Sequence, residues 1–163
     1  MPQKASAPIV LGIDPGLAAT GWAVVTNGGG GFRLLRSGTI TTTARTPLPQ
    51  RLAQAHGALQ SIVEAWRPTV VAIEAVYSKE AAPGASFAVG ASQTLAMLLA
   101  GQSGLPVVEV TASTVKKAVA GNGRAGKGAV ARAVQTLLGG ADGLSGHAAD
   151  AAAIALAGYL VSE

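Results

Sequence analysis

Apolar residues gather in three short runs at the start of the chain, separated by turn-forming residues. The run at 9–13 is followed by Asp14-Pro15-Gly16, and a second apolar run at 22–25 comes shortly after. An aliphatic run that ends in a Pro-Gly turn predicts a buried strand with an antiparallel return strand. The glycine-rich segment 27–31 predicts another turn, and residues 32–40 predict a third strand. We therefore expect an antiparallel meander.

After the meander, the spacing of apolar residues changes. In residues 50–66 they recur at intervals of three and four, which predicts an amphipathic helix that ends before Pro68. The short and nearly all-apolar run 70–74 predicts a strand covered on both faces. The remaining predicted elements are a helix at 85–99, a buried strand at 105–110, and helices at 111–120, 127–138 and 147–161.

The order of these elements predicts the fold class. Strands in a meander are antiparallel, whereas strands joined through helices can be parallel. An α/β fold with a mixed five-stranded sheet, three antiparallel strands followed by parallel ones, and helices on both faces satisfies both conditions. Because the sequence has no internal repeat or linker and only 163 residues, we expect a single domain over residues 1–163.

The composition narrows the classes of function. The chain is 49% hydrophobic and 12% charged, which is typical of a globular protein. It has no cysteine, which excludes disulfides and thiolate metal sites. Residues 1–8 lack the apolar core of a signal peptide, and no apolar run reaches the roughly 20 residues of a membrane span. We therefore expect a cytoplasmic protein that has no membrane partner.

A shortage of acidic residues produces the net charge of +4. A basic surface suits a polyanion such as nucleic acid, although many basic proteins bind none. With only eight acids in the chain, their positions are informative. Glu109 lies in an apolar stretch, but Val110 continues its strand, so we assign Glu109 a structural role. Three more acids lie in apolar stretches: Asp14, Glu74 and Asp150.

Asp14 stands at the end of the first predicted strand, where two interpretations are open. Burial of an unpaired carboxylate is costly, which predicts a cation as its partner. Alternatively, Asp14 caps the turn by accepting hydrogen bonds from backbone amides, because Asp-Pro-Gly is common in turns.

Three further residues join Asp14 in a candidate metal site: the carboxylate of Glu74, and His147 and Asp150 on the last predicted helix. Glu74 ends the strand at 70–74, so the two carboxylates leave the sheet at one edge if the two strands are parallel neighbours. His147 and Asp150 are three residues apart on the last predicted helix and therefore share a face. Ligands in open α/β sheets gather beyond the carboxyl ends of the strands. Oxygen and nitrogen donors that converge there predict a divalent-cation site.

Each of these residues also has a structural interpretation. Asp150 would be favoured by the helix dipole in a first turn, which is worth about 0.3–1 kcal/mol. His147 would bond to the backbone at the helix start, and Glu74 would pair with Lys79 or Arg67.

Four motifs, in order along the chain, carry a resemblance to a known family. They are Leu-Gly-Ile-Asp-Pro-Gly at 11–16 with Thr-Gly-Trp at 20–22, Ala-Ile-Glu-Ala-Val-Tyr at 72–77, Val-Lys-Lys-Ala-Val-Ala-Gly at 115–121 with Lys127, and His-Ala-Ala-Asp-Ala at 147–151. With these motifs the chain resembles the RuvC family of Holliday-junction resolvases over nearly its whole length. The resemblance implies a ribonuclease H-like fold, a homodimer, and cleavage of four-way DNA junctions with divalent metal. It also implies a junction branch-migration helicase complex as partner and a place on the bacterial nucleoid.

The resemblance assigns the catalytic metal ligands. Asp14, Glu74 and Asp150 match the acidic ligands of the family, and His147 stands where many members have a further Asp. Imidazole also ligates metals, and it suits Mn²⁺ better than Mg²⁺. We therefore expect two Mg²⁺ or Mn²⁺ ions per active site, with higher relative activity in manganese.

The resemblance also implies residues that contact DNA. Lys116 and Lys127 match basic positions that face DNA, and Lys117 and Arg124 belong to the same basic segment. Tyr77 occupies an aromatic position near the junction centre, where stacking on an unpaired base would be worth about 1–3 kcal/mol. The alternative for Tyr77 is packing at a strand end.

The ligand set implies a mechanism in which two metals about 4 Å apart bind the scissile phosphate. One metal would activate water and the other would stabilise the leaving 3′-oxygen, which leaves 5′-phosphate and 3′-hydroxyl ends. Lys127 would neutralise the charge that develops on the phosphorane. A two-fold dimer would place two sites on a two-fold junction, so that the incisions are paired and symmetric.

Other functions share parts of this pattern. The first hairpin resembles the phosphate-gripping hairpin of the actin, sugar-kinase and heat-shock ATPase superfamily, but those proteins carry the unit twice and are longer. Residues 121–128 approach the pattern G-x-x-x-x-G-K-[ST], but Gly128 replaces the hydroxyl and a helix precedes the loop where a strand is required. We interpret this loop as a DNA contact.

A non-catalytic junction-binding module would need the basic residues and Tyr77 but not the acids. A ribonuclease H-like nuclease that acts on RNA would need the same acids.

Overall fold

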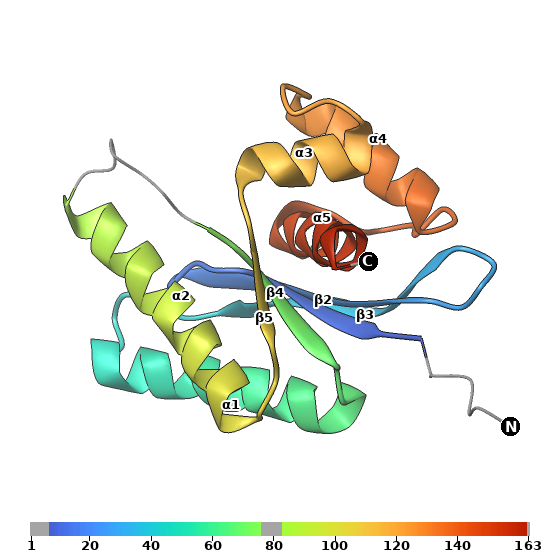
Figure 1. Cartoon of the computed structure of the whole chain (residues 1–163). Helices are drawn as coiled ribbons and strands as arrows, with labels where there is room; N and C mark the ends of the chain where they lie inside the picture. Colours follow the sequence, from blue (N-terminus) through green and yellow to red (C-terminus); the bar gives the residue numbers. More distant parts are fainter. Residues whose placement is uncertain (1–6, 76–82, 163) are drawn as a thin grey trace, which may run out of the picture.

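A five-stranded mixed sheet forms the centre of the computed structural model, which describes residues 7–75 and 83–162 (Figure 1). The strand order is β3-β2-β1-β4-β5. The first three strands pair antiparallel, and β4 pairs parallel with both β1 and β5. The predicted sheet is therefore confirmed. The strands are β1 (Ile9–Asp14), β2 (Ala19–Asn27), β3 (Phe32–Thr41), β4 (Val70–Glu74) and β5 (Val107–Val110).

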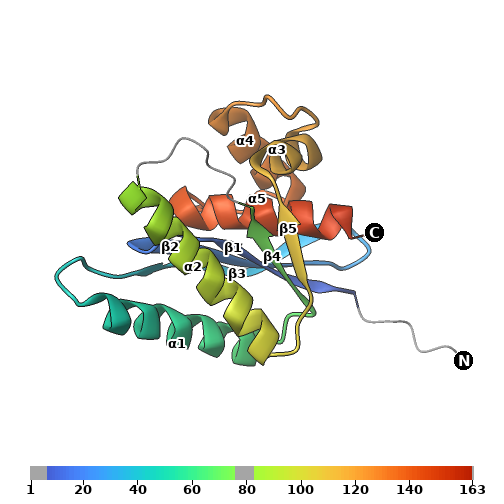
Figure 2. The same ribbon diagram turned by 60° about the vertical axis from the view of Figure 1, so that its left-hand side comes forward.

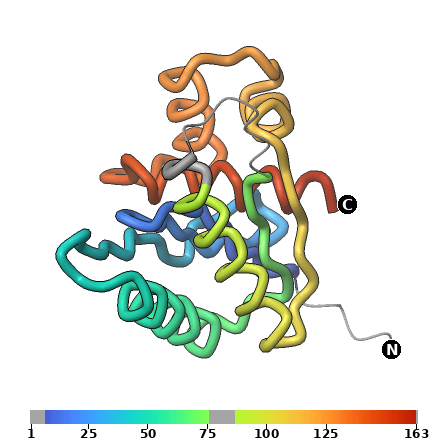
Figure 3. The backbone as a smooth tube through the Cα atoms, turned by 90° about the vertical axis from the view of Figure 1, so that its left-hand side faces the viewer, coloured from blue at the N-terminus to red at the C-terminus, as the bar shows by residue number. Residues whose placement is uncertain are grey.

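Helices cover both faces of this sheet, as predicted. Figures 1 and 2 show α1 and α2 on one face and α5 on the other, with α3 and α4 stacked on the outer side of α5. The tube in Figure 3 shows the same layers from another side. The helices are α1 (Leu48–Trp66), α2 (Pro83–Gln102), α3 (Ala112–Ala120), α4 (Lys127–Leu137) and α5 (Gly146–Val161).

The central part of α5 is apolar all round because it is covered all round. It contacts β1, β2 and β4 on one side and α3 and α4 on the other. All nine residues from 151 to 159 are buried. A helix in this position has no solvent-facing stripe, which explains its run of alanine, isoleucine and leucine.

Small residues bring α5 unusually close to the sheet. A Cβ placed on Gly12 would lie 2.7 Å from the Cβ of Ala155. A Cβ placed on Gly158 would lie 2.5 Å from the Cβ of Ala72. Both distances are well below ordinary van der Waals contact, so the backbones approach where no larger residue fits.

Successive side chains of β1 and β4 point to opposite faces of the sheet, and this alternation determines which of them pack against α5. Val10 of β1 and Ala72 of β4 pack in the cluster that contains α5. Their neighbours Leu11 and Ile73 pack on the other side, with α1 and α2. Because successive side chains in a strand point to opposite faces, the even-numbered residues of β1 and β4 face α5.

The predicted elements match the observed ones except in length and in one case of burial. The return strand β2 is longer than the predicted 22–25, and α1 begins at Leu48 with a proline in its first turn. The strand predicted at 105–110 is present as β5, but the prediction that it is buried is wrong. Strand β5 is shorter and lies at the edge of the sheet, where Val107 is 36% exposed. An apolar run does not reveal whether a strand has neighbours on both sides.

In the ranges that the structure describes, no helix combines the length and apolarity needed to cross a membrane. Residues 1–6, on which the expectation about a signal peptide partly depends, lie outside these ranges.

Candidate metal centre and nucleic-acid interface

Strands β1 and β4 bring two carboxylates to one edge of the sheet. They are parallel neighbours, with Gly12 opposite Ala72 and Ile13 opposite Ile73. Asp14 and Glu74 are the last residues of their strands. Because both are even-numbered members of alternating strands, both also point to the face that α5 covers. The parallel pairing on which the sequence hypothesis depended is therefore present.

The N-terminal end of α5 meets Asp14 at this edge. His147 Nδ1 lies 2.9 Å from Asp14 Oδ2, within hydrogen-bond distance. Within residues 7–75 and 83–162, this is the one contact under 4 Å between a carboxylate and a basic side chain. Asp14 is largely buried whereas His147 is half-exposed. The imidazole therefore contacts a carboxylate and still faces solvent.

Asp150 joins these two residues in a possible metal site. One ligand atom from each of Asp14, His147 and Asp150 lies within 4.8 Å of the others. Helix α5 begins at Gly146 and has no acid in its first turn, which weakens the helix-dipole explanation for Asp150. Two carboxylates and an imidazole are donors that bind divalent cations.

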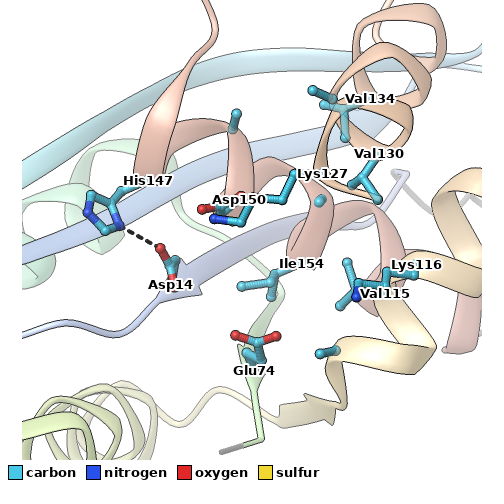
Figure 4. Close-up of a pocket in the computed structure, with 14 residues that line it drawn as sticks. Asp14, Glu74, Val115, Lys116, Lys127, Val130, Val134, His147, Asp150 and Ile154 are labelled. Atoms are coloured by element: carbon cyan, nitrogen blue, oxygen red, sulfur yellow. Dashed lines mark hydrogen bonds and ion pairs between the residues drawn. The ribbon is translucent and has the colours of Figure 1, made fainter. Parts of the chain in front are cut away.

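Glu74 lies beside this group without belonging to it. It lines the same cavity but is not among the ligand atoms within 4.8 Å of one another. Figure 4 shows its carboxylate below Asp150, across a gap from the Asp14–His147 pair. The proposed pairing of Glu74 with Arg67 is not found, and Lys79 lies outside the described residues. The four predicted ligands thus form a close group of three and one separate carboxylate.

A cavity of about 440 Å³ opens between the sheet edge, α5, and the α3–α4 pair. The acidic residues and His147 come from the strand ends and α5, whereas Lys116 comes from α3 and Lys127 from α4. In Figure 4 the side chain of Lys127 reaches toward Asp150. Apolar side chains form a wall of the cavity: Val115, Val130, Val134 and Ile154. This apolar wall was not among the predicted features of the site. Its helical spacing could have revealed it, because Val134 follows Val130 by four residues and Ile154 follows Asp150 by four.

Burial in this cavity disfavours charge on the two strand carboxylates. Desolvation raises the pKa of Asp14 above its ordinary value, and Asp150 adds to this while the hydrogen bond from His147 opposes it. Desolvation also raises the pKa of Glu74, and the charges of Asp14 and Asp150 add to this while Lys116 opposes it. Carboxylates that repel one another in a partly dry site are stabilised as anions by a bound cation.

The predicted DNA-contacting residues lie at different distances from the cavity. Lys116 of α3 and Lys127 at the start of α4 line it. Lys117 is exposed on α3 outside the lining, and Arg124 is exposed in the loop between the two helices. Tyr77 lies outside the described residues. The basic side chains therefore come from the α3–α4 side of the site.

Glu109 is excluded from the site by its position in β5. It is opposite Ile73 in the register and shares the orientation of Ile73, away from α5. Its carboxylate accepts a long hydrogen bond of 3.5 Å from Gln93 Nε2 of α2. Glu109 is exposed, not embedded in apolar surroundings as the sequence indicated.

The sheet order, together with the acids at the ends of β1 and β4, defines the ribonuclease H-like class of folds. The yeast mitochondrial Holliday junction resolvase Ydc2 shares this fold, with a TM-score of 0.62 and 14% identity over 92% of this chain and 78% of that one.

Comparison with known proteins then identifies a particular family. The model of the family "Crossover junction endodeoxyribonuclease RuvC" matches residues 10–158. The RuvC protein of Parvibaculum lavamentivorans is 39% identical over 146 residues, which cover 90% of this chain and 83% of that protein. The structure of Thermus thermophilus RuvC in complex with a Holliday junction substrate matches with a TM-score of 0.89 and 31% identity, covering 95% of this chain and 94% of that one. The chain belongs to the RuvC family of crossover junction endodeoxyribonucleases.

Proposed function

We propose that this protein resolves four-way DNA junctions by paired, symmetric, metal-dependent hydrolysis of phosphodiester bonds. The observation that carries the proposal is the convergence of three predicted ligands within 4.8 Å, in the cavity that Glu74 also lines. Family membership and the junction bound to the related T. thermophilus protein support four-way DNA as the substrate. The protein acts in recombination and repair, on the nucleoid in the cytoplasm.

The donor set fits two divalent cations. Asp14, His147 and Asp150 would hold one ion, and Glu74 would hold the second together with Asp14. Crowding and burial of these carboxylates raise the pKa of Asp14 and of Glu74, so a bound cation relieves an unfavourable arrangement. Such ions supply an activated water and stabilise the leaving 3′-oxygen when they are bound. The imidazole ligand favours Mn²⁺ over Mg²⁺, because Mg²⁺ prefers oxygen donors.

The side chains of the site hold the substrate and balance its charge. The contact with Asp14 fixes the ring of His147 over the sheet edge. Lys127 begins α4 at the cavity, where its ammonium group neutralises charge that develops on the scissile phosphate. Lys116 lies on the same side and attracts the neighbouring backbone.

The basic side of the cavity continues as a DNA-binding surface. Lys117 and Arg124 are exposed next to Lys116 and Lys127, and each phosphate contact contributes a salt-dependent share of the affinity. Tyr77 would stack on a base at the crossover.

A second copy of the chain supplies the second incision. Helix α2 exposes Phe87 (62%) and Leu98 (53%), two large apolar side chains that a dimer interface would cover. A cavity of about 410 Å³ between α1 and α2 adds to this apolar surface. A two-fold dimer matches a two-fold junction, and a branch-migration helicase complex would deliver the substrate.

The test compares three substrates: a mobile four-way junction, a linear duplex and an RNA–DNA hybrid, each with Mg²⁺ and with Mn²⁺. We expect paired cuts in the junction and none in the other two. Asp14→Asn should bind the junction without cutting it, and the control Glu109→Gln should cut like the wild type. Absence of cutting by the wild type would indicate a non-catalytic binding module. Faster cutting of the hybrid would indicate a nuclease that acts on RNA.

A further inference from the structure

Gly21 of β2 lies beside Asp14 in the sheet and against the first turn of α5, which carries His147. The β1–β2 register places it opposite Asp14. Opposite residues in an antiparallel pair point to the same face of the sheet. A side chain at position 21 would therefore point toward α5, as the carboxylate of Asp14 does.

The first turn of α5 already occupies that space. A Cβ on Gly21 would collide with the backbone carbonyl oxygen of His147 and would lie 2.9 Å from the Cβ of His147. Gly21 is not among the glycines with positive φ, so its conformation suits any residue. What the position requires is the absence of a side chain.

We propose that Gly21 is a positioning residue for the metal centre. Because it lacks a Cβ, the start of α5 rests on the backbone of β2, which brings His147 to 2.9 Å from Asp14 and places Asp150 within 4.8 Å of both. Even one added methyl group would lift the first turn and separate the helix ligands from the strand ligand. Metal–ligand distances tolerate only about 0.2 Å, so a small lift is enough to weaken ion binding. The inference rests on the proposed metal-dependent function.

The same helix offers a matched control. A Cβ on Gly158 would also crowd the contact between α5 and the sheet, 2.5 Å from the Cβ of Ala72. Gly158 lies eleven residues beyond His147, about 16 Å along the helix axis. Gly158→Ala therefore disturbs the packing of α5 without disturbing the end that carries the ligands.

The experiment compares Gly21→Ala with Gly158→Ala in the full chain. Three quantities are measured: the Mn²⁺ dissociation constant by calorimetry without DNA, the metal-free melting temperature, and kcat and KM on a four-way junction. We expect both variants to melt at lower temperature. Only Gly21→Ala should weaken Mn²⁺ binding by about tenfold or more and lower kcat, with KM for the junction unchanged. Gly158→Ala should keep the wild-type Mn²⁺ affinity and kcat.

Two results would overturn the proposal. One is a folded Gly21→Ala variant with wild-type Mn²⁺ affinity, which would make Gly21 a packing residue only. The other is an equal loss of Mn²⁺ affinity in both variants, which would indicate a general loosening of α5. If Gly21→Ala does not fold, Gly12→Ala replaces it, because a Cβ there would collide with the backbone carbonyl oxygen of Ala151, the residue that follows Asp150. Unchanged Mn²⁺ affinity in that variant would contradict the premise that the close approach of α5 to the sheet sets the positions of the ligands, and the proposal would fall with it.

The same measurements separate this inference from the proposed function. A wild-type protein that binds Mn²⁺ but leaves the junction intact would refute the resolvase function, and the comparison of Mn²⁺ affinities would still decide the role of Gly21. A wild-type protein that binds no Mn²⁺ would refute both.

Discussion

The two faces of the sheet are packed in different ways, and only one of them carries the site. The α1–α2 face is filled with large side chains such as Leu11, Ile13 and Leu59. On the α5 face, glycine and alanine supply the closest contacts between the helix and the sheet, among them Gly12 with Ala155 and Gly158 with Ala72. Large side chains hold two backbones apart, whereas small ones allow close approach. A short carboxylate on a strand can contact an imidazole on a helix only across the close-packed face.

The largest effect on kcat should come from replacing a carboxylate by its amide on the α5 face, compared with the same replacement on the opposite face of a neighbouring strand. Glu74→Gln removes a proposed metal ligand on the α5 face, so we expect kcat on a four-way junction to fall by at least about 100-fold. Glu109→Gln on β5 points to the other face and should leave kcat unchanged. Cleavage assays with saturating Mn²⁺ measure both. A similar loss in both variants would show that the face does not matter.

Shortening a buried side chain on the α1–α2 face should lower the stability of the protein and leave its Mn²⁺ affinity unchanged. Leu59 is 1% exposed beneath the sheet, so Leu59→Ala should lower the free energy of unfolding by about 2–5 kcal/mol. The Mn²⁺ affinity should not change at a temperature where the variant is folded. Urea unfolding and calorimetry measure the two quantities, and a loss of Mn²⁺ affinity in the folded variant would contradict the separation of the faces.

His147 should set the choice of metal. His147→Asp supplies an oxygen donor in place of nitrogen, so we expect the ratio of manganese to magnesium activity to fall by about tenfold. Cleavage rates at saturating concentrations of each ion measure the ratio. Equal or greater activity of the wild type with magnesium would refute the expected preference for manganese.

The smallest effect should be a dependence of the stability of the metal-free protein on pH. Burial raises the pKa of Asp14 from 3.8 and that of Glu74 from 4.5, so the folded state holds protons that the unfolded state has lost. Stability should therefore fall as the pH rises from these ordinary values through the raised ones, and remain reduced at neutral pH. Thermal unfolding in a chelator should show this fall in the wild type and less of it in Asp14→Asn. Saturating Mn²⁺ should reverse it.

Much of the fold follows from local patterns in the sequence. The meander, the strand at 70–74 and the helix that carries His147 and Asp150 are each marked by a local run of apolar residues. Strand ends and a spacing of three residues are also local, which is why the candidate ligands could be chosen before their distances were known. The edge position of β5 is not local, because it depends on which strand has no further neighbour.

The spatial grouping of the ligands was not predictable in the same way. Nothing in the sequence separates Glu74 from the group of three, because that separation depends on how far α5 stands from β4. Gly21 has no functional group, so no chemical pattern marks it. Its importance follows only from the position of His147 above it.

The contact between Asp14 and His147 joins residues 133 positions apart. A chain emerging from the ribosome therefore has the meander and the strand-borne acids long before it has the helix that completes the ligand set. Until α5 docks, one face of the sheet is uncovered, and His147 and Asp150 are not yet beside Asp14. The proposed ligand set is therefore completed by the last helix in the order of the chain, after the sheet that carries Asp14 and Glu74 has been synthesised.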